Sequence, residues 1–339
     1  MSLLRLTGTH PPAAIEGGRV TIDGTGFVIN GSQLPAVTIG GVGARVVFAS
    51  STQLAVIVPA GLEGGHHPVR VASGASTGEA GFVSIAASFA TGLHQVDNPV
   101  FDRDGNLYVT YSGTRGQQVP VSIFRVRPNG TRETFSSGIV NPTSMAVGPG
   151  GGLYVSSRFE GVVYRVAPDG SVEPFASDLG VACGLAFAPE AEGGTLFVGD
   201  RSGTIFKVDR SGRATMFTSL PASVAAFHLA YGPDGALYVT GPTLSPYDAL
   251  YRIATDGTVT KQYEGFGRPQ GLAFDAQGTL HVVEALAGTS GLYRMRPENE
   301  SGEPDLVLAG AGLVGVAFDR AGGLVVASND TAYRLPRAT

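Results

Sequence analysis

Residues 271–282, GLAFDAQGTLHV, are one copy of a pattern that recurs along the chain and indicates its fold. It reads as an apolar strand, a tight turn with glycine, and a second strand that opens on leucine. The second strands of the six copies begin at Leu107, Leu153, Leu196, Leu237, Leu280 and Leu324. These positions differ by 46, 43, 41, 43 and 44 residues, a period typical of four-stranded propeller blades. The sequence therefore predicts an all-β protein with a six-bladed β-propeller.

Residues 1–86 lack this period and are predicted to form a separate domain. Short alternating strands are divided there by turns such as Asp23-Gly24 and Gly40-Gly41, a pattern that favours a small β-sandwich. We therefore expect two domains, at residues 1–86 and 87–339.

The order of motifs in the first domain resembles the IPT/TIG family of immunoglobulin-like domains. The turn Gly24-Thr25-Gly26-Phe27, the hairpin at residues 36–41 (AVTIGG) and the strand at residues 54–59 (LAVIVP) carry the resemblance, which covers roughly residues 9–86. It implies an interaction or spacer module with no active site, which contacts another protein or packs on the propeller.

The propeller is predicted to close with a strand from its own beginning. Residues 88–93 (SFATGL) parallel the fourth strands at 133–138 and 173–178, whereas the last repeat stops after its third strand at residues 331–335. We therefore expect residues 87–94 to supply the outer strand of the last blade, which removes an exposed sheet edge.

Composition excludes several classes of function. The net charge is −5 and the only lysines are Lys207 and Lys261, so nucleic-acid binding is not expected. No segment has the roughly 20 apolar residues of a membrane span. The N-terminus lacks the apolar core of a signal peptide, which predicts a cytoplasmic protein as the chain stands, or an extracytoplasmic one if an upstream signal has been removed. The single cysteine, Cys183, excludes an internal disulfide.

The two faces of the predicted propeller differ. Tight Gly-containing turns join first to second and third to fourth strands, and both sets lie on one face. The opposite face carries the longer connections, at residues 111–119, 241–248 and 284–290. Uneven loops on a rigid scaffold usually carry binding sites, so we expect the functional site on that long-loop face.

Residues 87–339 resemble NHL-type propellers and, more distantly, the gluconolactonase/regucalcin family, through blocks such as 184–187 (GLAF) and 271–275 (GLAFD). That resemblance implies a divalent cation at the channel mouth, held by Glu, Asn and Asp oxygens. The equivalent positions in this chain are Asp97, Thr143, Cys183, Phe227, Gln270 and Val314. Only Asp97 is an anionic oxygen ligand, so no cofactor is predicted, and calcium or another divalent cation at Asp97 is the alternative.

A register shifted by one residue brings Asn98, Ser144 or His228 inward instead. Separately, Cys183 and His228 fall on neighbouring blades at the same level, which allows a thiolate–imidazole pair, although a lone cysteine at the start of an apolar strand is more often a buried packing residue. His281 stands where other repeats carry Tyr or Phe, so we expect it to pack as well.

Two carboxylates occupy one repeat position. Asp200 and Glu284 follow second strands, where another repeat carries Tyr111. They either cap the loop that follows or line the open mouth. Other candidates near the mouth are Asn98, Asn141, Ser144 and Gln270, with Arg115, Arg158, Arg201 and Arg268 above them.

These residues support two functions. The first is a binding propeller for a small polar molecule or a protein segment; its candidate residues are Asn98, Thr143, Ser144, Cys183, Phe227, Gln270, Tyr111, Arg158, Asp200, Arg201 and Glu284. The alternative is a lactonase-like hydrolase or a lyase with Asp97 and His228 as catalytic residues. A purely structural surface module is a third reading. Polar channel linings also occur without function, because water fills them.

Overall fold

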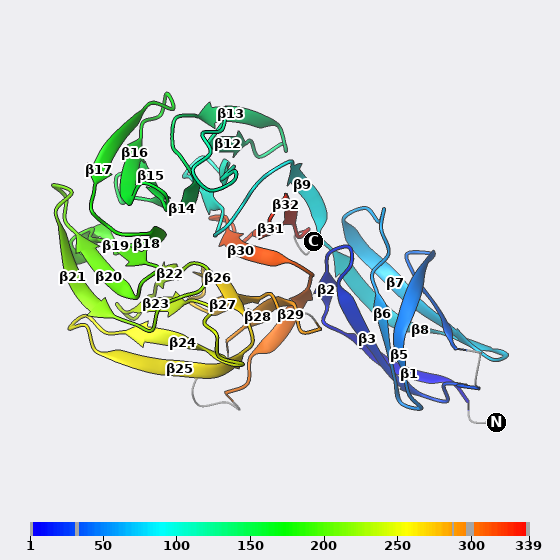
Figure 1. The fold of residues 1–339 in the computed structure, drawn as a ribbon. Helices are drawn as coiled ribbons and strands as arrows, with labels where there is room; N and C mark the ends of the chain where they lie inside the picture. Colours follow the sequence, from blue (N-terminus) through cyan, green and yellow to red (C-terminus); the bar gives the residue numbers. More distant parts are fainter. Residues whose placement is uncertain (1–2, 31–33, 287, 296–301, 337–339) are drawn as a thin grey trace.

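The computed structural model describes residues 3–30, 34–286, 288–295 and 302–336. The chain is all-β and has two parts, a propeller and an N-terminal sandwich beside it (Figure 1). A 3-10 turn, η1 (Glu190–Glu192), is the one helical element in the described ranges. No helix among them is long and apolar enough to cross a membrane.

The sandwich buries the inward side chains of alternating strands. Its strands are β1 (Arg5–His10), β3 (Arg19–Thr25), β4 (Ala36–Ile39), β5 (Val42–Ala49), β6 (Gln53–Ile57), β7 (Gly65–Ser73) and β8 (Ser76–Ile85). The first half of β5 pairs with β4 and its second half with β6, so β5 joins the two layers. Val20, Ile22, Ile39, Leu54 and Val69 are fully buried between them, because apolar residues at every second strand position face the same side.

Five four-stranded antiparallel sheets of the propeller stand on their own. The first contains β10 (Val100–Phe101), β11 (Leu107–Thr110), β12 (Ile123–Val126) and β13 (Arg132–Ser136), and the second β14 (Pro142–Val147), β15 (Leu153–Ser157), β16 (Val162–Val166) and β17 (Val172–Ala176). The third contains β18 (Ala182–Phe187), β19 (Leu196–Asp200), β20 (Thr204–Val208) and β21 (Ala214–Ser219), and the fourth β22 (His228–Tyr231), β23 (Leu237–Thr240), β24 (Asp248–Ile253) and β25 (Val259–Phe266). The fifth separate sheet contains β30 (Leu313–Phe318), β31 (Leu324–Ser328), β32 (Thr331–Arg334) and β9 (Ala87–Thr91).

The prediction of a six-bladed propeller was therefore wrong in its count, since five blades form sheets of their own. The remaining repeat consists of β26 (Pro269–Phe274), β27 (Leu280–Glu284), β28 (Gly291–Arg294) and β29 (Asp305–Ala309). These strands pair in the same order, but β29 also pairs with β2 (Ala13–Ala14), which pairs with β8. The outer edge of this repeat is thus continued by the sandwich, and both belong to one 12-stranded sheet.

The strand from the beginning of the propeller takes the expected place. β9 pairs antiparallel with β32, with Ala90 opposite Ala332 and Ala87 opposite Arg334. The sequence predicts this outer strand at residues 87–94. Without β9 the sheet would end at β32, with an exposed edge.

The junction of the two parts is built on β2. Ala14 lies in the core of the sandwich, whereas its neighbours Ala13 and Ile15 lie in a core with Leu292, Leu308 and other propeller residues. The backbone N–H of Ile15 also donates to the carbonyl oxygen of Ala309 at 2.9 Å. Both hydrogen bonds and apolar burial therefore hold the sandwich against the propeller.

Candidate functional site

The first strands of the repeats surround the propeller axis. β10, β14, β18, β22, β26 and β30 contact one another in this cyclic order, and β10 also contacts β30. Residues at the start of β10 and of β22 consequently face one another across the ring.

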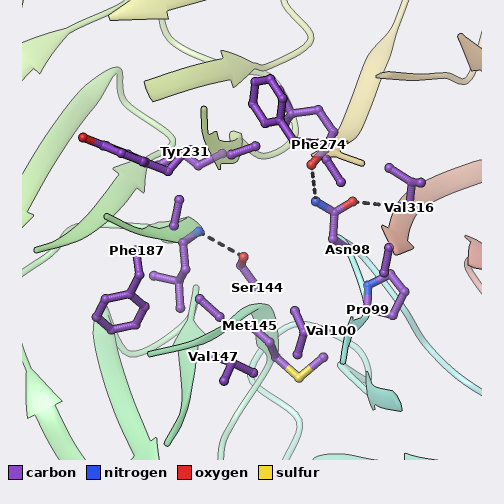
Figure 2. Close-up of a pocket in the computed structure, with 18 of the residues that line it drawn as sticks. Asn98, Pro99, Val100, Ser144, Met145, Val147, Phe187, Tyr231, Phe274 and Val316 are labelled. Carbon is purple, nitrogen blue, oxygen red and sulfur yellow. Dashed lines mark hydrogen bonds between the residues drawn. The ribbon is translucent and has the colours of Figure 1, made fainter. Parts of the chain in front are cut away.

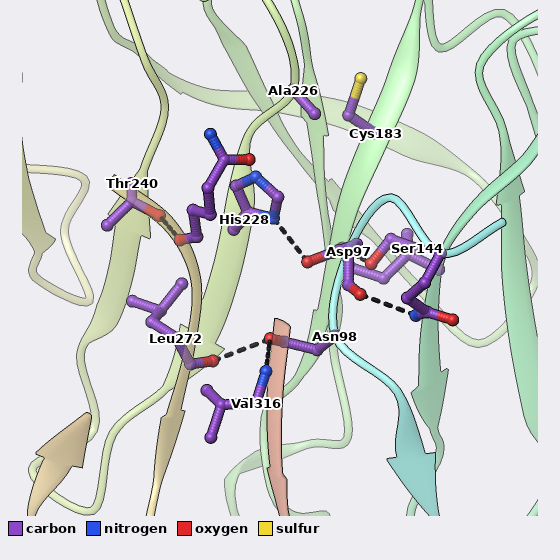
Figure 3. Close-up of polar contacts among 12 residues, drawn as sticks. Asp97, Asn98, Ser144, Cys183, Ala226, His228, Thr240, Leu272 and Val316 are labelled. Carbon is purple, nitrogen blue, oxygen red and sulfur yellow. Dashed lines mark hydrogen bonds and ion pairs between the residues drawn. The ribbon is translucent and has the colours of Figure 1, made fainter. Parts of the chain in front are cut away.

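Asp97 and His228 meet across this ring (Figure 3). Nδ1 of His228 lies 2.6 Å from Oδ1 of Asp97, and the two side chains are 3% and 0% exposed. An ionised carboxylate can only accept, so Nδ1 carries the proton of this contact. Nε2 of His228 is buried and has no hydrogen-bond partner in the structure. The pair predicted for an enzyme is therefore assembled, but inside the molecule.

Asn98 and Ser144 form hydrogen bonds with strands of other repeats. The amide of Asn98 donates to the carbonyl oxygen of Leu272 at 2.8 Å, and its oxygen accepts from the N–H of Val316 at 2.9 Å. The hydroxyl oxygen of Ser144 accepts from the N–H of Leu185 at 3.0 Å. These polar atoms satisfy buried backbone groups of adjacent strands.

Four other residues of the predicted ring are buried, whereas Val314 is only partly buried. Thr143, Cys183 and Phe227 are at most 1% exposed and Gln270 is 7% exposed. The hydroxyl of Thr143 donates to the carbonyl oxygen of Asn141 at 3.0 Å. The carbonyl of Gln270 accepts from the hydroxyl of Thr240 at 2.5 Å.

Cys183 is not activated as a nucleophile. Its thiol lies 3.1 Å from the carbonyl oxygen of Val181, and burial raises its pKa to about 12. The imidazole of His228 is engaged with Asp97 instead. Because the thiolate is the reactive form, the geometry does not favour the Cys183–His228 pair.

The donor set does not fit the cation that the lactonase resemblance implies. A hard cation takes several oxygen ligands, but Asp97 is bound to His228 and the other ring positions include Cys183 and Phe227. Among the described residues no group of three or more His, Cys, Asp or Glu side chains is placed to hold a metal ion.

Glu284 and Asp200 cap loops. Glu284 accepts from the N–H groups of Gly267, Arg268 and Leu286 at 2.7, 2.9 and 2.6 Å. Asp200 accepts from the N–H of Val181 at 2.8 Å and from the hydroxyl of Ser202. Both carboxylates are under 10% exposed, which matches the loop-capping alternative. Tyr111 lies edge-on to the ring of His94, with centroids 6.0 Å apart.

A pocket of 220 Å³ opens on the long-loop face. It is lined by Arg115, Arg158, Phe159, Val181, Arg201 and Ala225. Burial lowers the pKa of Arg158, and the positive charges of Arg201 and Arg115 lower it further. The structure thus brings together two arginines of the predicted ligand-binding set, Arg158 and Arg201, with a third cation beside them.

Sequence reasoning missed the apolar part of this pocket. Phe159, Val181 and Ala225 lie in connections whose residues carry no chemical signal of their own. A signal for the arginines was present, since Arg115, Arg158 and Arg201 follow the second strands of three successive repeats.

Two further cavities lie elsewhere. One of 340 Å³ is formed by the first strands on the tight-turn face, with Phe187, Tyr231 and Phe274 at its wall and Asn98 and Ser144 among its polar lining (Figure 2). Another of 670 Å³ lies between the sandwich and the propeller, where residues such as Arg19 and Thr289 line it.

Residues 6–89 match the family model of the IPT/TIG domain. A search of curated proteins finds no match. Among solved structures, an auxiliary nutrient binding protein from Bacteroides ovatus is similar, with a TM-score of 0.54, 15% identity and 99% of each chain covered.

Two of the similar solved structures are named as enzymes. A putative gluconolactonase has a TM-score of 0.58 and 17% identity, over 74% of this chain and 94% of that one. A catalytically inactive virginiamycin B lyase from Staphylococcus aureus, solved with quinupristin, has a TM-score of 0.52 and 16% identity. The similarity covers 99% of this chain and 96% of that one. The resemblances stated from sequence, to IPT/TIG domains and to gluconolactonase-like propellers, are thereby confirmed; at these identities the structures show the fold alone.

Proposed function

We propose that the chain is a binding protein whose propeller holds a small polar ligand, or a polar protein segment, at the long-loop face. The observation that carries this proposal is the arginine-lined pocket of 220 Å³ on that face. The buried contact of Asp97 with His228 occupies the axis of the ring, so the accessible polar groups are those of the loops. We further propose that the propeller is of the NHL type and that the domains divide at residues 86 and 87.

Ligand screening with mapping of the contact surface tests this function. Thermal melts with a panel of sugars, amino acids, carboxylates and phosphates identify binders, because a ligand of the folded state raises the melting temperature. Hydrogen exchange with each binder then locates it. We expect protection of residues 111–119, 158–161 and 201–203. Protection confined to the cavity on the tight-turn face, or no binder, would contradict the proposal.

A hydrolase or lyase is the second candidate, and the Asp97–His228 pair is the observation that favours it. A carboxylate on Nδ1 orients an imidazole and leaves Nε2 to accept a proton. Because both side chains are almost fully buried, a substrate reaches Nε2 only if the surrounding structure opens. Turnover of lactones or esters that is lost in His228→Gln but kept in Arg158→Gln would favour this enzyme over the binding protein.

A further inference from the structure

The arginine pocket is a concentration of positive charge on an acidic protein. The whole chain has a net charge of −5, yet three of the six residues that line this pocket are arginines. Arg115 and Arg201 are exposed and Arg158 is half-buried. The repulsion among them lowers the pKa of Arg158, after the larger effect of its burial.

No carboxylate of the described residues forms an ion pair with these three arginines. The acidic side chains nearby have other partners. Asp200 accepts from the backbone of Val181, and Glu160 interacts with the hydroxyl of Tyr164. Within the described ranges the positive charge of the pocket is therefore not neutralised by an ion pair and is available to an external anion.

The loop that carries Arg115 is held in place. The oxygen of Asn141 accepts from the N–H of Gly116 at 2.6 Å, and its amide donates to the carbonyls of Ser112 and Thr114, each at 2.7 Å. The ring of Phe159 packs against Gly116, where an added Cβ would lie 3.1 Å from it. Arg115 thus projects from an ordered loop, which lowers the entropic cost of using it in binding.

We propose that this pocket binds a small organic anion that carries two or more carboxylate or phosphate groups. The guanidinium group presents planar paired donors that match both anions, and Phe159, Val181 and Ala225 provide an apolar wall for the carbon skeleton. The volume of 220 Å³ is below the roughly 300 Å³ at which drug-sized pockets begin, so the ligand is of metabolite size. This inference rests on the proposed binding function and names its ligand class.

Titration calorimetry at low salt with citrate and with inorganic phosphate tests the proposal. We expect binding of at least one probe, with affinity reduced about tenfold or more in both Arg158→Gln and Arg201→Gln. Arg320→Gln is the matched control, because Arg320 is an exposed arginine in the turn between β30 and β31, on the opposite face. The Arg320→Gln variant should bind the anionic probe with the same affinity as the unchanged protein.

The outcomes separate the two anions and the two proposals. Tighter binding of citrate assigns carboxylates, and tighter binding of phosphate assigns a phosphate ester. Failure of both probes to bind, or equal losses in Arg320→Gln, overturns the anion site. If the anion site is overturned but a neutral compound protects the long-loop face in hydrogen exchange, the proposed binding function still stands. If no compound protects that face, the binding function fails as well. Because Arg201 is exposed, its variant should fold even if Arg158→Gln does not.

Discussion

At the scale of single residues, the contact between Asp97 and His228 joins two ionisable groups that are almost wholly removed from water. Removal of one partner leaves the other buried and unpaired, which is far more costly than the loss of a surface ion pair. We expect Asp97→Ala to lower the free energy of unfolding by about 3 to 5 kcal/mol, measured by urea denaturation.

The control for this variant is an exposed ion pair. Lys261 and Glu264 lie 2.7 Å apart, with side chains 53% and 51% exposed. Glu264→Ala should cost less than about 1 kcal/mol. A similar loss in both variants would mean that the buried pair contributes no more than a solvated one.

His281 belongs to a repeated contact in which Tyr is the usual member. The hydroxyls of Tyr108 and Tyr238 donate to Asp102 and Asp234 at 3.1 Å, and Nε2 of His281 lies 3.1 Å from Asp275. The position of His281 in a Tyr or Phe slot was expected from the repeats. The imidazole therefore packs where a phenol normally does.

Burial lowers the pKa of His281, and the carboxylate of Asp275 only partly opposes this change. Well above a pH of about 6.5 the histidine is neutral in both states; as the pH falls through that value, the unfolded chain takes up the proton first, so stability is lost. We expect His281→Tyr to remove this loss of stability as the pH falls through about 6.5, measured by denaturation at several pH values. If the free energy of unfolding depends on pH in the same way in His281→Tyr, then His281 does not contribute to the pH dependence of stability.

The ring around Asp97 provides no oxygen set for a hard cation, so chelation should have no effect. We expect equal melting temperatures with and without a chelator, and no rise on addition of calcium. A fall with chelator, together with stoichiometric metal in elemental analysis, would show a site that these side chains do not reveal.

At the scale of elements, the turns between third and fourth strands pack on the preceding sheet. Gly212, between β20 and β21, has φ +83° and an added Cβ there would collide with the carbonyl oxygen of Phe175 in β17. Only glycine allows both the left-handed conformation and this close approach. The turn thus aligns adjacent sheets as well as reversing the chain.

We expect Gly212→Ala to destabilise the protein by about 2 kcal/mol or more, measured by denaturation. Gly151→Ala is the matched control, because Gly151 has φ +86° and no atom within 4 Å of an added Cβ. It should cost only about 1 kcal/mol, from the backbone conformation alone. Equal losses of stability in the two variants would show that the whole effect comes from the positive φ and not from the close approach to Phe175.

At the scale of the whole molecule, the sandwich and one repeat of the propeller share a continuous sheet through β2. Ile15 is 2% exposed and lies in a core with Leu292 and Leu313 of the propeller. Packing and backbone pairing at this junction should make the two parts unfold together.

We expect a single calorimetric transition for the protein and two for Ile15→Ala, which loses about 2 to 5 kcal/mol of packing at the junction. Ile123→Ala, in the core of the first propeller sheet, is the control and should lower the transition without dividing it. Two transitions already in the unchanged protein would show that the shared sheet does not couple the parts.

The repeat, the tight turns, the sandwich and the closing strand could all be predicted from the sequence, because strand alternation and glycine turns are encoded within a few neighbouring residues. It also indicated Arg158 and Arg201 as candidate ligand-binding residues. Three features became visible only in the folded chain: Asp97 meets His228 at a separation of 131 residues, Glu284 caps a loop, and β29 continues into the sandwich in place of a sixth separate sheet. These contacts depend on how the ring closes and on which partner each side chain or strand edge meets there, and no local pattern specifies that.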